Sequence, residues 1–520
     1  MSNLAVKKGL EILASATNVD ALRRLIVMTI IGGYLSPAST IDEPAKDDSL
    51  SALLSRLPTK PLGELAAISK GKTGIKDATP GFFPLVVTAE ARSTSDHFDF
   101  EGPGVMIPMV SSTGHGDASL KRIHYQDGQY AVGSILAVIQ PNDSSVLSAR
   151  YLHAFLSAFK DELLVSRMVG TANVSLTMAK ISDVPVPLLP IQGQLKIDEL
   201  MTLCDRLEAE QADADAAHAK LIETLLGTLT QSTDAADLAA NWQRLAEHFD
   251  TLFTTESSLD ALKQTILQLA VMGKLVPQDL KDEPASELLK RIAQERARLE
   301  AEGVCKKSKP MPPVDESNVP FALPNGWAWA RFPEVGQLGR GKSKHRPRND
   351  PALFNPGIYP LVQTGEVARA GTIVREVHSK YSDVGLSQSK MWPQGTLCIT
   401  IAANIADSAI LGFDACFPDS VVGFVPSELF GDSYYFLWFM KTAREELLKF
   451  APSTAQKNIN LEILEAVRIP LPPNAEMQRI VAKVDELMAL CDRLKADLGE
   501  SRNRQERLAC TLIESALEAA

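Results

Sequence analysis

Apolar residues recur at helical spacing in two long stretches of the chain, and both stretches open with nearly the same ten residues. Asp198–Leu207 reads DELMTLCDRL, and Asp485–Leu494 reads DELMALCDRL. Each copy follows a proline-rich extended stretch, and apolar residues then continue three or four positions apart. This spacing predicts long helices at 191–230 and 474–517. The repeated decapeptide also indicates an internal duplication of the chain.

A second helical pattern is repeated as well. Residues 10–37 are predicted to be helical, and the run ends at a Gly-Gly pair typical of a helix C-terminus. Its sequence Asp20–Arg23 matches Asp260–Lys263 at an offset of 240 residues. The second copy predicts a helix from about Leu259 to Leu275, and a further helix is predicted at Ser286–Glu302. The helical parts of the two halves are therefore copies of each other.

Two intervening segments have a different pattern. In residues 58–190 and 318–473, short β-rich runs alternate with Gly, Pro, Asn and Asp turn residues. Each segment is predicted to contain one longer helix, at about 148–166 and 434–450. Each also ends on a similar polar loop. We therefore predict two mixed α/β or mostly β domains, whose sequences have diverged while the helices stayed alike.

The predicted fold class is α+β. It consists of two mixed α/β domains separated by long paired antiparallel helices, with an internal pseudo-twofold duplication. The predicted boundaries are an N-terminal helical segment (1–57), a first domain (58–190), a central helical region (191–317), a second domain (318–473) and a C-terminal helix (474–520).

Composition and charge place the chain among ordinary globular proteins. Apolar residues make up 45% and charged residues 22% of the chain. The net charge of −11 argues at first against nucleic-acid binding. However, residues 58–190 carry 11 Lys+Arg against 12 Asp+Glu, and residues 318–473 carry 15 against 14. The acidity therefore lies in the helical parts, and the two domains are near neutral with clustered cations.

The cysteines and the N-terminus indicate the compartment. The six cysteines are widely separated and form no CxxC pair, which argues against zinc ribbons and disulfide frameworks. The N-terminus lacks the layout of a signal peptide. The longest apolar run is far shorter than the roughly 20 residues needed to span a bilayer. These features predict a cytoplasmic location without membrane attachment.

One stretch matches a nucleotide-binding pattern. Gly336–Ser343 reads GQLGRGKS and fits G-x-x-x-x-G-K-[ST]. A phosphate-binding loop of this kind needs a strand before it and a helix after it. The residues that follow include Pro347 and Pro351, which disfavour a regular helix. A P-loop NTPase is therefore the alternative hypothesis from the enzyme class.

The same stretch is better interpreted as a DNA phosphate-contact loop. Cations on a loop that is kept irregular by Gly and Pro can neutralise phosphates and give salt-dependent affinity. The alternative is a solvated basic loop. The candidate DNA-binding residues here are Arg340, Lys342, Ser343, Lys344, Arg346 and Arg348. The first domain has a thinner counterpart in Lys70, Lys72 and Thr73.

Further polar loops could contact DNA. One combines hydroxyl groups and a histidine with nearby cations, although it could equally be an ordinary hairpin loop: Ser111, Ser112, Thr113, His115, Lys121 and Arg122. The loops that close the two domains carry amides, hydroxyls and cations, and an amide can bind adenine through two hydrogen bonds. Their candidates are Arg167, Thr171 and Asn173 in the first domain, and Thr454, Gln456, Lys457 and Asn458 in the second.

Catalytic and metal-binding patterns are not found in the sequence. The eight histidines form no HExxH or other ligand-spaced group, so structural or surface roles are favoured. No GxSxG motif, no Asn/Asp-Pro-Pro-Phe/Tyr methyltransferase motif and no glycine-rich S-adenosylmethionine loop stand out. We therefore predict no catalytic residues, no metal site and no cofactor bound by this chain.

Taken together, these features resemble the specificity subunit of type I restriction–modification enzymes. The resemblance covers nearly the whole chain and rests on the paired decapeptides and their proline-rich leads. Leu262–Gln278 resembles the central repeat of that family. Pro61–Thr73 and Trp329–Ser343 resemble the entries to its two target-recognition domains. One departure is that the entry to the first long helix, at 190–194, is four residues shorter than its partner.

The resemblance implies a DNA-recognition function without catalysis. Each target-recognition domain would bind one half of a split, asymmetric DNA site, and the paired helices would set the gap between the halves. Two modification subunits would methylate adenine N6 with S-adenosylmethionine, and restriction subunits would add ATP- and Mg-dependent translocation and cleavage in phage defence. A coiled-coil scaffold whose domains bind proteins is the remaining alternative.

Overall fold

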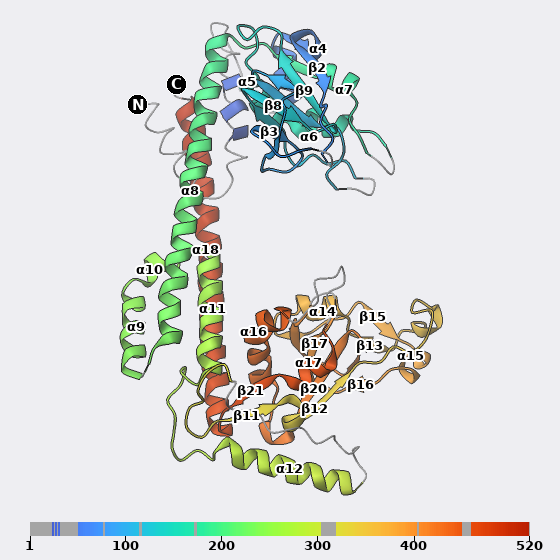
Figure 1. Cartoon of the computed structure of the whole chain (residues 1–520), viewed down its shortest axis with the longest axis vertical. Helices are drawn as coiled ribbons and strands as arrows, with labels where there is room; N and C mark the ends of the chain where they lie inside the picture. Colours follow the sequence, from blue (N-terminus) through green and yellow to red (C-terminus); the bar gives the residue numbers. More distant parts are fainter. Residues whose placement is uncertain are drawn as a thin grey trace. The chain divides into compact units, whose positions relative to one another are not determined.

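In the computed structural model, the chain divides into two compact units (Figure 1). Unit 1 comprises residues 1–216 and 500–520, and unit 2 comprises residues 217–499. The structure describes residues 23–24, 26–28, 30–31, 50–75, 78–113, 117–170, 174–233, 235–302, 319–402, 405–449 and 459–518.

The helices of unit 1 are short, except for the long helix that continues from it into unit 2. They are α3 (Leu50–Arg56), α4 (Leu62–Leu65), α5 (Ala149–Ala158), α6 (Lys160–Leu163), the 3-10 helix η1 (Val165–Arg167), α7 (Met178–Ser182) and the long α8 (Ile191–Gln231). The strands are β1 (Thr59–Pro61), β2 (Ala66–Lys70), β3 (Phe83–Val86), β4 (Ser93–Ser95), β5 (Phe100–Glu101), β6 (Gly104–Pro108), β7 (His124–Gln126), β8 (Gln129–Val132), β9 (Leu136–Pro141) and β10 (Pro185–Pro187).

Two four-stranded sheets form the strand domain of unit 1, with strand orders β2-β9-β6-β7 and β4-β3-β8-β5. Successive residues of the central strand β6 belong to different cores. Val105 and Ile107 pack in one hydrophobic cluster with helix α5, and Met106 packs in another with Tyr130 of the second sheet. Because side chains alternate between the faces of a strand, β6 is buried on both sides. This explains its continuous apolar sequence.

The first domain closes where its two ends meet. Strand β1 pairs antiparallel with β10, so residues before and after the sheets lie side by side. The hydroxyl of Tyr151, which is fully buried in α5, donates to the carbonyl oxygen of Pro187 at 2.8 Å. Gln194 at the start of α8 is also fully buried, and its amide donates to the carbonyl oxygen of Val146 at 2.8 Å. These bonds fix the domain to the beginning of α8.

Unit 2 contains more helices. They are α9 (Ala235–Glu247), α10 (Phe249–Leu252), α11 (Glu256–Val271), α12 (Ala285–Ala301), α13 (Phe332–Val335), η3 (Pro351–Leu353), α14 (Thr364–Arg369), α15 (Asp383–Ser387), η4 (Glu428–Phe430), α16 (Tyr434–Lys449), α17 (Leu461–Ala466) and α18 (Asn474–Glu518), which continues into unit 1. The strands are β11 (Ala328–Arg331), β12 (Gly336–Arg340), β13 (Tyr359–Leu361), β14 (Ile373–Val374), β15 (Ser379–Tyr381), β16 (Met391–Trp392), β17 (Leu397–Thr400), β18 (Ser408–Leu411), β19 (Ala415–Cys416), β20 (Val421–Pro426) and β21 (Arg468–Leu471).

The strand domain of unit 2 has corresponding features. Its sheets have the orders β12-β20-β17-β18-β14 and β15-β13-β19-β16, and β11 pairs antiparallel with β21. The hydroxyl of Tyr435 in α16 donates to the carbonyl oxygen of Pro470, as Tyr151 does to Pro187 in the first domain. Both units therefore secure a domain helix to the extended strand that precedes a long helix.

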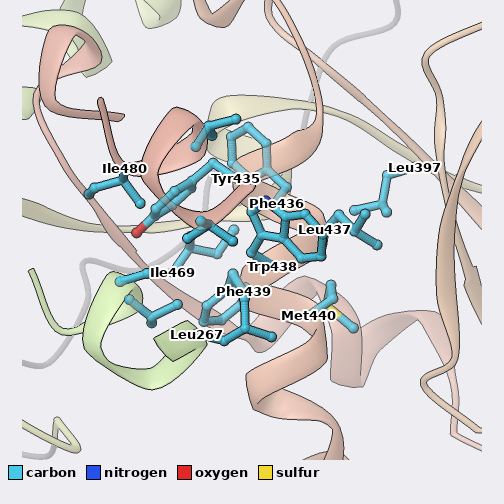
Figure 2. Packing of buried hydrophobic residues seen from close by; sticks show 14 of the residues in the cluster. Leu267, Leu397, Tyr435, Phe436, Leu437, Trp438, Phe439, Met440, Ile469 and Ile480 are labelled. Carbon is cyan, nitrogen blue, oxygen red and sulfur yellow. The ribbon is translucent and has the colours of Figure 1, made fainter. Parts of the chain in front are cut away.

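Helix α16 joins this domain to the helices of unit 2. Figure 2 shows the aromatic run from Tyr435 to Phe439 packed with Leu267 of α11, Ile480 of α18 and Ile469 of β21. Most of these side chains are almost fully buried. Removing such apolar area from water is the main favourable term in folding. The strand domain and the helices of unit 2 therefore share one hydrophobic core.

Several sequence-based predictions on single elements are confirmed, and others need correction. The long helices α8 and α18 fall close to the predicted bounds. The helix predicted at 148–166 is instead divided into α5, α6 and η1. The segment 231–258 of the predicted central helical region contains helices α9 and α10. Of the helix predicted at 10–37, only seven residues lie within the described part of the chain, and these are helical.

The repeated decapeptide packs within its own unit. Met201 and Cys204 belong to a cluster with Ile26 and Val27 of the first helical repeat. Cys491 belongs to the corresponding cluster with Leu262 of α11. The apolar positions of each decapeptide therefore pack against the repeat helix and the strand domain of the same unit.

Candidate nucleic-acid interface

In the first domain, two of the predicted DNA-binding segments follow strands that end at the same end of the sheet. The strand register aligns Lys70 of β2 with Ala137 of β9, and Ala137 with Ile107 of β6. Both β2 and β6 run antiparallel to β9, so their C-terminal ends lie at the same edge. The cations Lys70 and Lys72 are exposed there. The structure thus brings them toward the loop that follows β6.

The loop after β6 is closed by its own hydroxyl groups. Ser111 Oγ donates to the carbonyl oxygen of Asp117 at 2.6 Å, and Ser112 Oγ donates to that of Ser119 at 3.0 Å. Thr113 Oγ1 donates to the carbonyl oxygen of Asp117 at 3.2 Å. These hydroxyls are exposed or half-buried, but they are committed to shaping the loop. They remain available to DNA only as acceptors or after rearrangement.

The closing loop of the first domain lies beside this loop. Val110 forms a β-bridge with Ser175, and the backbone N–H of Ser111 donates to the carbonyl oxygen of Val174 at 3.0 Å. Two segments that are distant in sequence thus share one edge of the domain. Thr171 and Asn173 precede this contact, but they lie outside the described residues, as does His115.

The nearby cations are only partly free. Arg122 forms an ion pair with Glu90 at 2.7 Å, in which the Glu90 side chain is 84% exposed. Arg167 donates to the carbonyl oxygen of Leu163 at 2.6 Å and therefore stabilises the end of α6. Lys121 is exposed, and its carbonyl oxygen accepts from Lys160 at 3.1 Å. An exposed pair such as Arg122–Glu90 is weak, so Arg122 can exchange its partner for a phosphate.

Thr73 has a structural position that the sequence did not indicate. Its side chain is 5% exposed, and its hydroxyl donates to Asp99 Oδ2 at 2.7 Å. His97 Nε2 lies 3.2 Å from Thr73 Oγ1. A buried hydroxyl with two internal partners cannot reach a phosphate or base edge. We therefore remove Thr73 from the residues proposed to contact DNA.

In the second domain, the basic loop leaves the sheet at the corresponding edge. We define the basic loop as residues Arg340–Arg348. Arg340 of β12 pairs with Val422 of β20, and Val422 pairs with Ile399 near the end of β17. The backbone N–H of Ile459 donates to the carbonyl oxygen of Ile401 at 3.0 Å. The closing segment of this domain therefore ends beside β17, but Thr454, Gln456, Lys457 and Asn458 lie outside the described residues.

Two of the five cations in the basic loop are bonded to Asp419. Arg340 donates to the carbonyl oxygen of Asp419, and Arg348 forms an ion pair with the carboxylate of Asp419 at 3.0 Å. The other three, Lys342, Lys344 and Arg346, are exposed. Among the described residues, none of these three forms an ion pair with a carboxylate. Their charge is therefore available for phosphates.

Arg346 and Ser343 also contribute to the internal structure of the basic loop. Arg346 folds back and donates to the carbonyl oxygens of Ser343 and His345, each at 2.8 Å. The side chain of Ser343 is half-buried. The backbone N–H of Ala352 donates to Asp350 Oδ1 at 2.9 Å, and His345 Nε2 lies 2.7 Å from Asp350 Oδ2. The bond from Ala352, and then the contact with His345, lower the pKa of the Asp350 carboxyl. The basic loop is thus internally braced.

The P-loop alternative is wrong in its geometry. Gly336–Arg340 forms the antiparallel strand β12, whereas a P-loop requires these residues to form the turn after a strand. No helix begins within residues 341–350, all of which the structure describes. The helix N-terminus that would bind phosphate is therefore lacking.

The structure adds residues that the sequence interpretation missed. Lys390 lies over the ring of Trp392, with Nζ 3.5 Å from the ring centroid. Burial and then the charge of Lys342 lower the pKa of Lys390, so this fourth cation stands close to the basic loop. Gln388 accepts hydrogen bonds from the loop backbone. The only signal for Lys390 in the sequence is its position two residues before Trp392. No local sequence pattern indicates Gln388.

Other kinds of site find no support. Among the described residues, no group of three or more His, Cys, Asp or Glu side chains is arranged to bind a metal ion. In the same part of the chain, no helix combines the length and apolar character required to cross a membrane. The described cysteines Cys204, Cys398, Cys416 and Cys491 are buried free thiols, and burial raises the pKa of each.

A protein with two strand domains, each exposing cations and polar loops at one sheet edge, has the features of a nucleic-acid-binding protein. Comparisons with known proteins specify the family. Residues 324–500 match the model of the type I restriction modification DNA specificity domain. The EcoAI specificity subunit of Escherichia coli is 32% identical, over 96% of this chain and 94% of that protein. The EcoEI specificity subunit of Escherichia coli is 30% identical over the same shares.

The chain therefore belongs to the specificity subunits of type I restriction enzymes. Proteins of this family are the DNA-recognition subunits and are not the catalytic ones. A chain solved in work on complex assembly and conformational transition of the type I R-M system is also similar. It is 18% identical, with a TM-score of 0.47, over 89% of this chain and 98% of that one.

Proposed function

We propose that this chain recognises a bipartite, asymmetric DNA site, with one half bound by residues 58–190 and the other by residues 318–473. The observation that carries the proposal is the basic loop, because Lys342, Lys344 and Arg346 are exposed cations without a carboxylate partner among the described residues. Membership in the specificity-subunit family indicates that the ligand is double-stranded DNA.

The two domains would contribute differently to affinity. The basic loop of the second domain has three exposed cations without a carboxylate partner among the described residues. The first domain has the exposed Lys70 and Lys72, and its Arg122 is paired with Glu90. Contacts with phosphates give affinity, and contacts with base edges give sequence preference. Since the loops of the two domains differ in sequence, the two half-sites should also differ in sequence.

The long helices would set the distance between the half-sites. Helix α8 has 41 residues and α18 has 45. At about 1.5 Å per residue, each is on the order of 60 Å long, whereas half-sites one turn of B-DNA apart lie roughly 34–36 Å from centre to centre. Antiparallel pairing of these helices in a pseudo-twofold arrangement is part of the proposal. The repeated decapeptide and the matching Tyr151 and Tyr435 bonds support it.

The catalytic steps are assigned to partner subunits. In the proposed assembly, two methyltransferase subunits bind this chain and methylate adenine N6 with S-adenosylmethionine. Restriction and translocase subunits would use ATP and Mg²⁺. The chain itself binds none of these cofactors in this proposal.

A domain exchange tests the proposal. Residues 58–190 are replaced by the first domain of a related specificity subunit, and the methylome of a host carrying the assembled complex is sequenced. We expect one half of the methylated site to change while the other half and the gap length are retained. The complex with the unchanged chain is the control. A change in both halves would refute the assignment of one domain to one half-site.

A second experiment separates this function from a protein-binding scaffold. The assembled complex is tested for protection of specific DNA sequences against nuclease digestion. Specific protection supports DNA recognition by the two domains. Its absence, together with normal assembly of the subunits, would favour the scaffold.

A further inference from the structure

Gln388 holds the backbone of the basic loop from a separate part of the chain. It directly follows helix α15, and its Oε1 accepts from the backbone N–H of Lys344 at 2.6 Å and from that of His345 at 3.1 Å. A backbone N–H can only donate, so the oxygen of the amide must face the loop. The two adjacent N–H groups therefore determine the orientation of the Gln388 side chain.

The two ends of the basic loop are attached by other contacts. At its start, the backbone N–H of Lys342 donates to the carbonyl oxygen of Phe417 at 3.2 Å. At its end, Arg348 forms an ion pair with Asp419 at 3.0 Å. Among the described residues that lie outside 340–350, only Gln388 forms hydrogen bonds with the backbone of residues 343–348. Gln388 therefore attaches the backbone in the middle of the loop to the rest of the domain.

The segment that carries Gln388 is itself firmly attached. Ser382 caps α15 and is 2% exposed. Its hydroxyl donates to the carbonyl oxygen of Ala352 at 2.6 Å and accepts from the backbone N–H of Gly385 at 3.2 Å. The next residue after Gln388, Ser389, donates through Oγ to the carbonyl oxygen of Lys342 at 3.1 Å. Gln388 therefore directly follows a helix that these hydrogen bonds hold in place.

Among the described residues, the Gln388 side chain forms hydrogen bonds only with the basic loop. The Nε2 of Gln388 is buried and has no hydrogen-bond partner among the described residues. A buried donor without a partner costs free energy. The gain that offsets this cost must come from the two bonds that Oε1 makes with the basic loop.

We propose that Gln388 is a positioning residue for DNA binding, which holds the basic loop in the conformation that presents Lys342, Lys344 and Arg346 to phosphates. This inference rests on the proposed function of the basic loop. Like charges in one loop repel each other, and a disordered loop loses conformational entropy when it binds. A loop that is already ordered in the free protein avoids most of that loss.

The test uses Gln388→Met in the full chain, assembled with its modification subunits, and a DNA duplex that contains the recognised site. Methionine keeps the length of the side chain and removes the acceptor. We expect affinity to fall by about tenfold, which corresponds to about 1.4 kcal/mol. Hydrogen exchange of the peptide covering 342–350 should become faster. Ser387→Ala is the matched control, because Ser387 Oγ donates only to Val384 within α15.

A combined variant decides whether Gln388 acts through the loop. In a background with Lys342→Ala, Lys344→Ala and Arg346→Ala, the additional change Gln388→Met should cause no further loss of affinity. An independent, additive loss would overturn the positioning role. Unchanged affinity of Gln388→Met, beside weakened binding of the triple variant, would also overturn it. Unchanged binding of the triple variant would instead refute the proposed function of the basic loop.

A further variant keeps the test valid if Gln388→Met does not fold. Gln388→Glu retains an acceptor and removes the unpaired donor, so slow hydrogen exchange at residues 344 and 345 should be retained. Fast exchange there in a folded Gln388→Glu variant would contradict the role of the side-chain oxygen.

Discussion

Lys263 of α11 forms an ion pair with Asp492 of the decapeptide in α18. In unit 1, Arg23 forms the corresponding pair with Asp205 of the other decapeptide, at 2.7 Å. Arg23 and Lys263 are equivalent positions of the first repeat, and Asp205 and Asp492 are equivalent positions of the decapeptide. Each unit therefore joins its own repeat helix to its own decapeptide through the same pair of positions.

Stability should depend on the apolar contacts around this ion pair rather than on the pair itself. Ile266 of α11 is 1% exposed, so Ile266→Ala should lower the free energy of unfolding by about 2–5 kcal/mol. The Asp492 side chain is 67% exposed, and Asp492→Asn should cost less than about 1 kcal/mol. Urea denaturation of the full chain measures both. Equal losses in the two variants would contradict this order.

The neighbours Lys72 and Thr73 should have opposite effects. Thr73→Val removes the buried hydrogen bond with Asp99 and should destabilise the chain by about 1–3 kcal/mol. It should leave the salt dependence of DNA binding unchanged. Lys72→Ala should leave stability nearly unchanged and reduce the slope of log affinity against log salt by about 1. DNA affinity measured at several salt concentrations, together with thermal unfolding, distinguishes these results. A reduced slope in Thr73→Val would restore Thr73 as a DNA contact.

Asp419 should weaken DNA binding in the native chain. Its carboxylate pairs with Arg348 at 3.0 Å and places a negative charge beside the basic loop. Asp419→Asn retains the carbonyl oxygen that accepts from Arg340 and releases Arg348. We expect affinity to rise on the order of fivefold, since two charges about 4 Å apart in water interact by roughly 1 kcal/mol. Asp414→Asn is a suitable control, because Asp414 accepts from the backbone of Gln394 and contacts no cation of the loop. Unchanged affinity in Asp419→Asn would show that Arg348 is not near phosphate.

The sequence was sufficient for elements with a long regular pattern. Helices α8 and α18 were predicted within a few residues, because apolar positions three or four apart continue over many turns. Strands as short as β5 (Phe100–Glu101) and β14 (Ile373–Val374) carry no period that could be recognised. The Ala, Leu, Gln and Arg content of α9 favours a helix.

For the candidate site, the sequence indicated charge but not its partners. The five cations of the basic loop could be seen directly in the chain. Asp419 lies 71 residues from Arg348, and Gln388 lies 44 residues from Lys344, so only folding brings them together. Thr73 likewise belonged to a polar pattern whose burial depends on Asp99, which is 26 residues away. Which cations are free is therefore a property of the tertiary structure.

Acidification should destabilise the first domain through His124. This side chain is 4% exposed in β7, and its Nδ1 lies 3.1 Å from Nη1 of Arg92. Burial, and then the positive charges of Arg92 and Arg122, lower the pKa of His124 to about 4 from an ordinary value of 6.5. Between these two pH values, the unfolded chain binds a proton that the folded chain does not.

The free energy of unfolding should therefore fall as the pH falls through about 6.5, and the loss should end near pH 4, with a total of at most about 3 kcal/mol. Thermal unfolding between pH 7.5 and 5 measures this loss. His124→Gln removes the titrating group and keeps an acceptor for Arg92, so its stability should change less over the same range. His153→Gln is a comparison variant, because burial lowers the pKa of His153 as well, so this variant should also reduce the loss. An identical pH dependence in the wild type and in His124→Gln would show that His124 does not couple folding to pH.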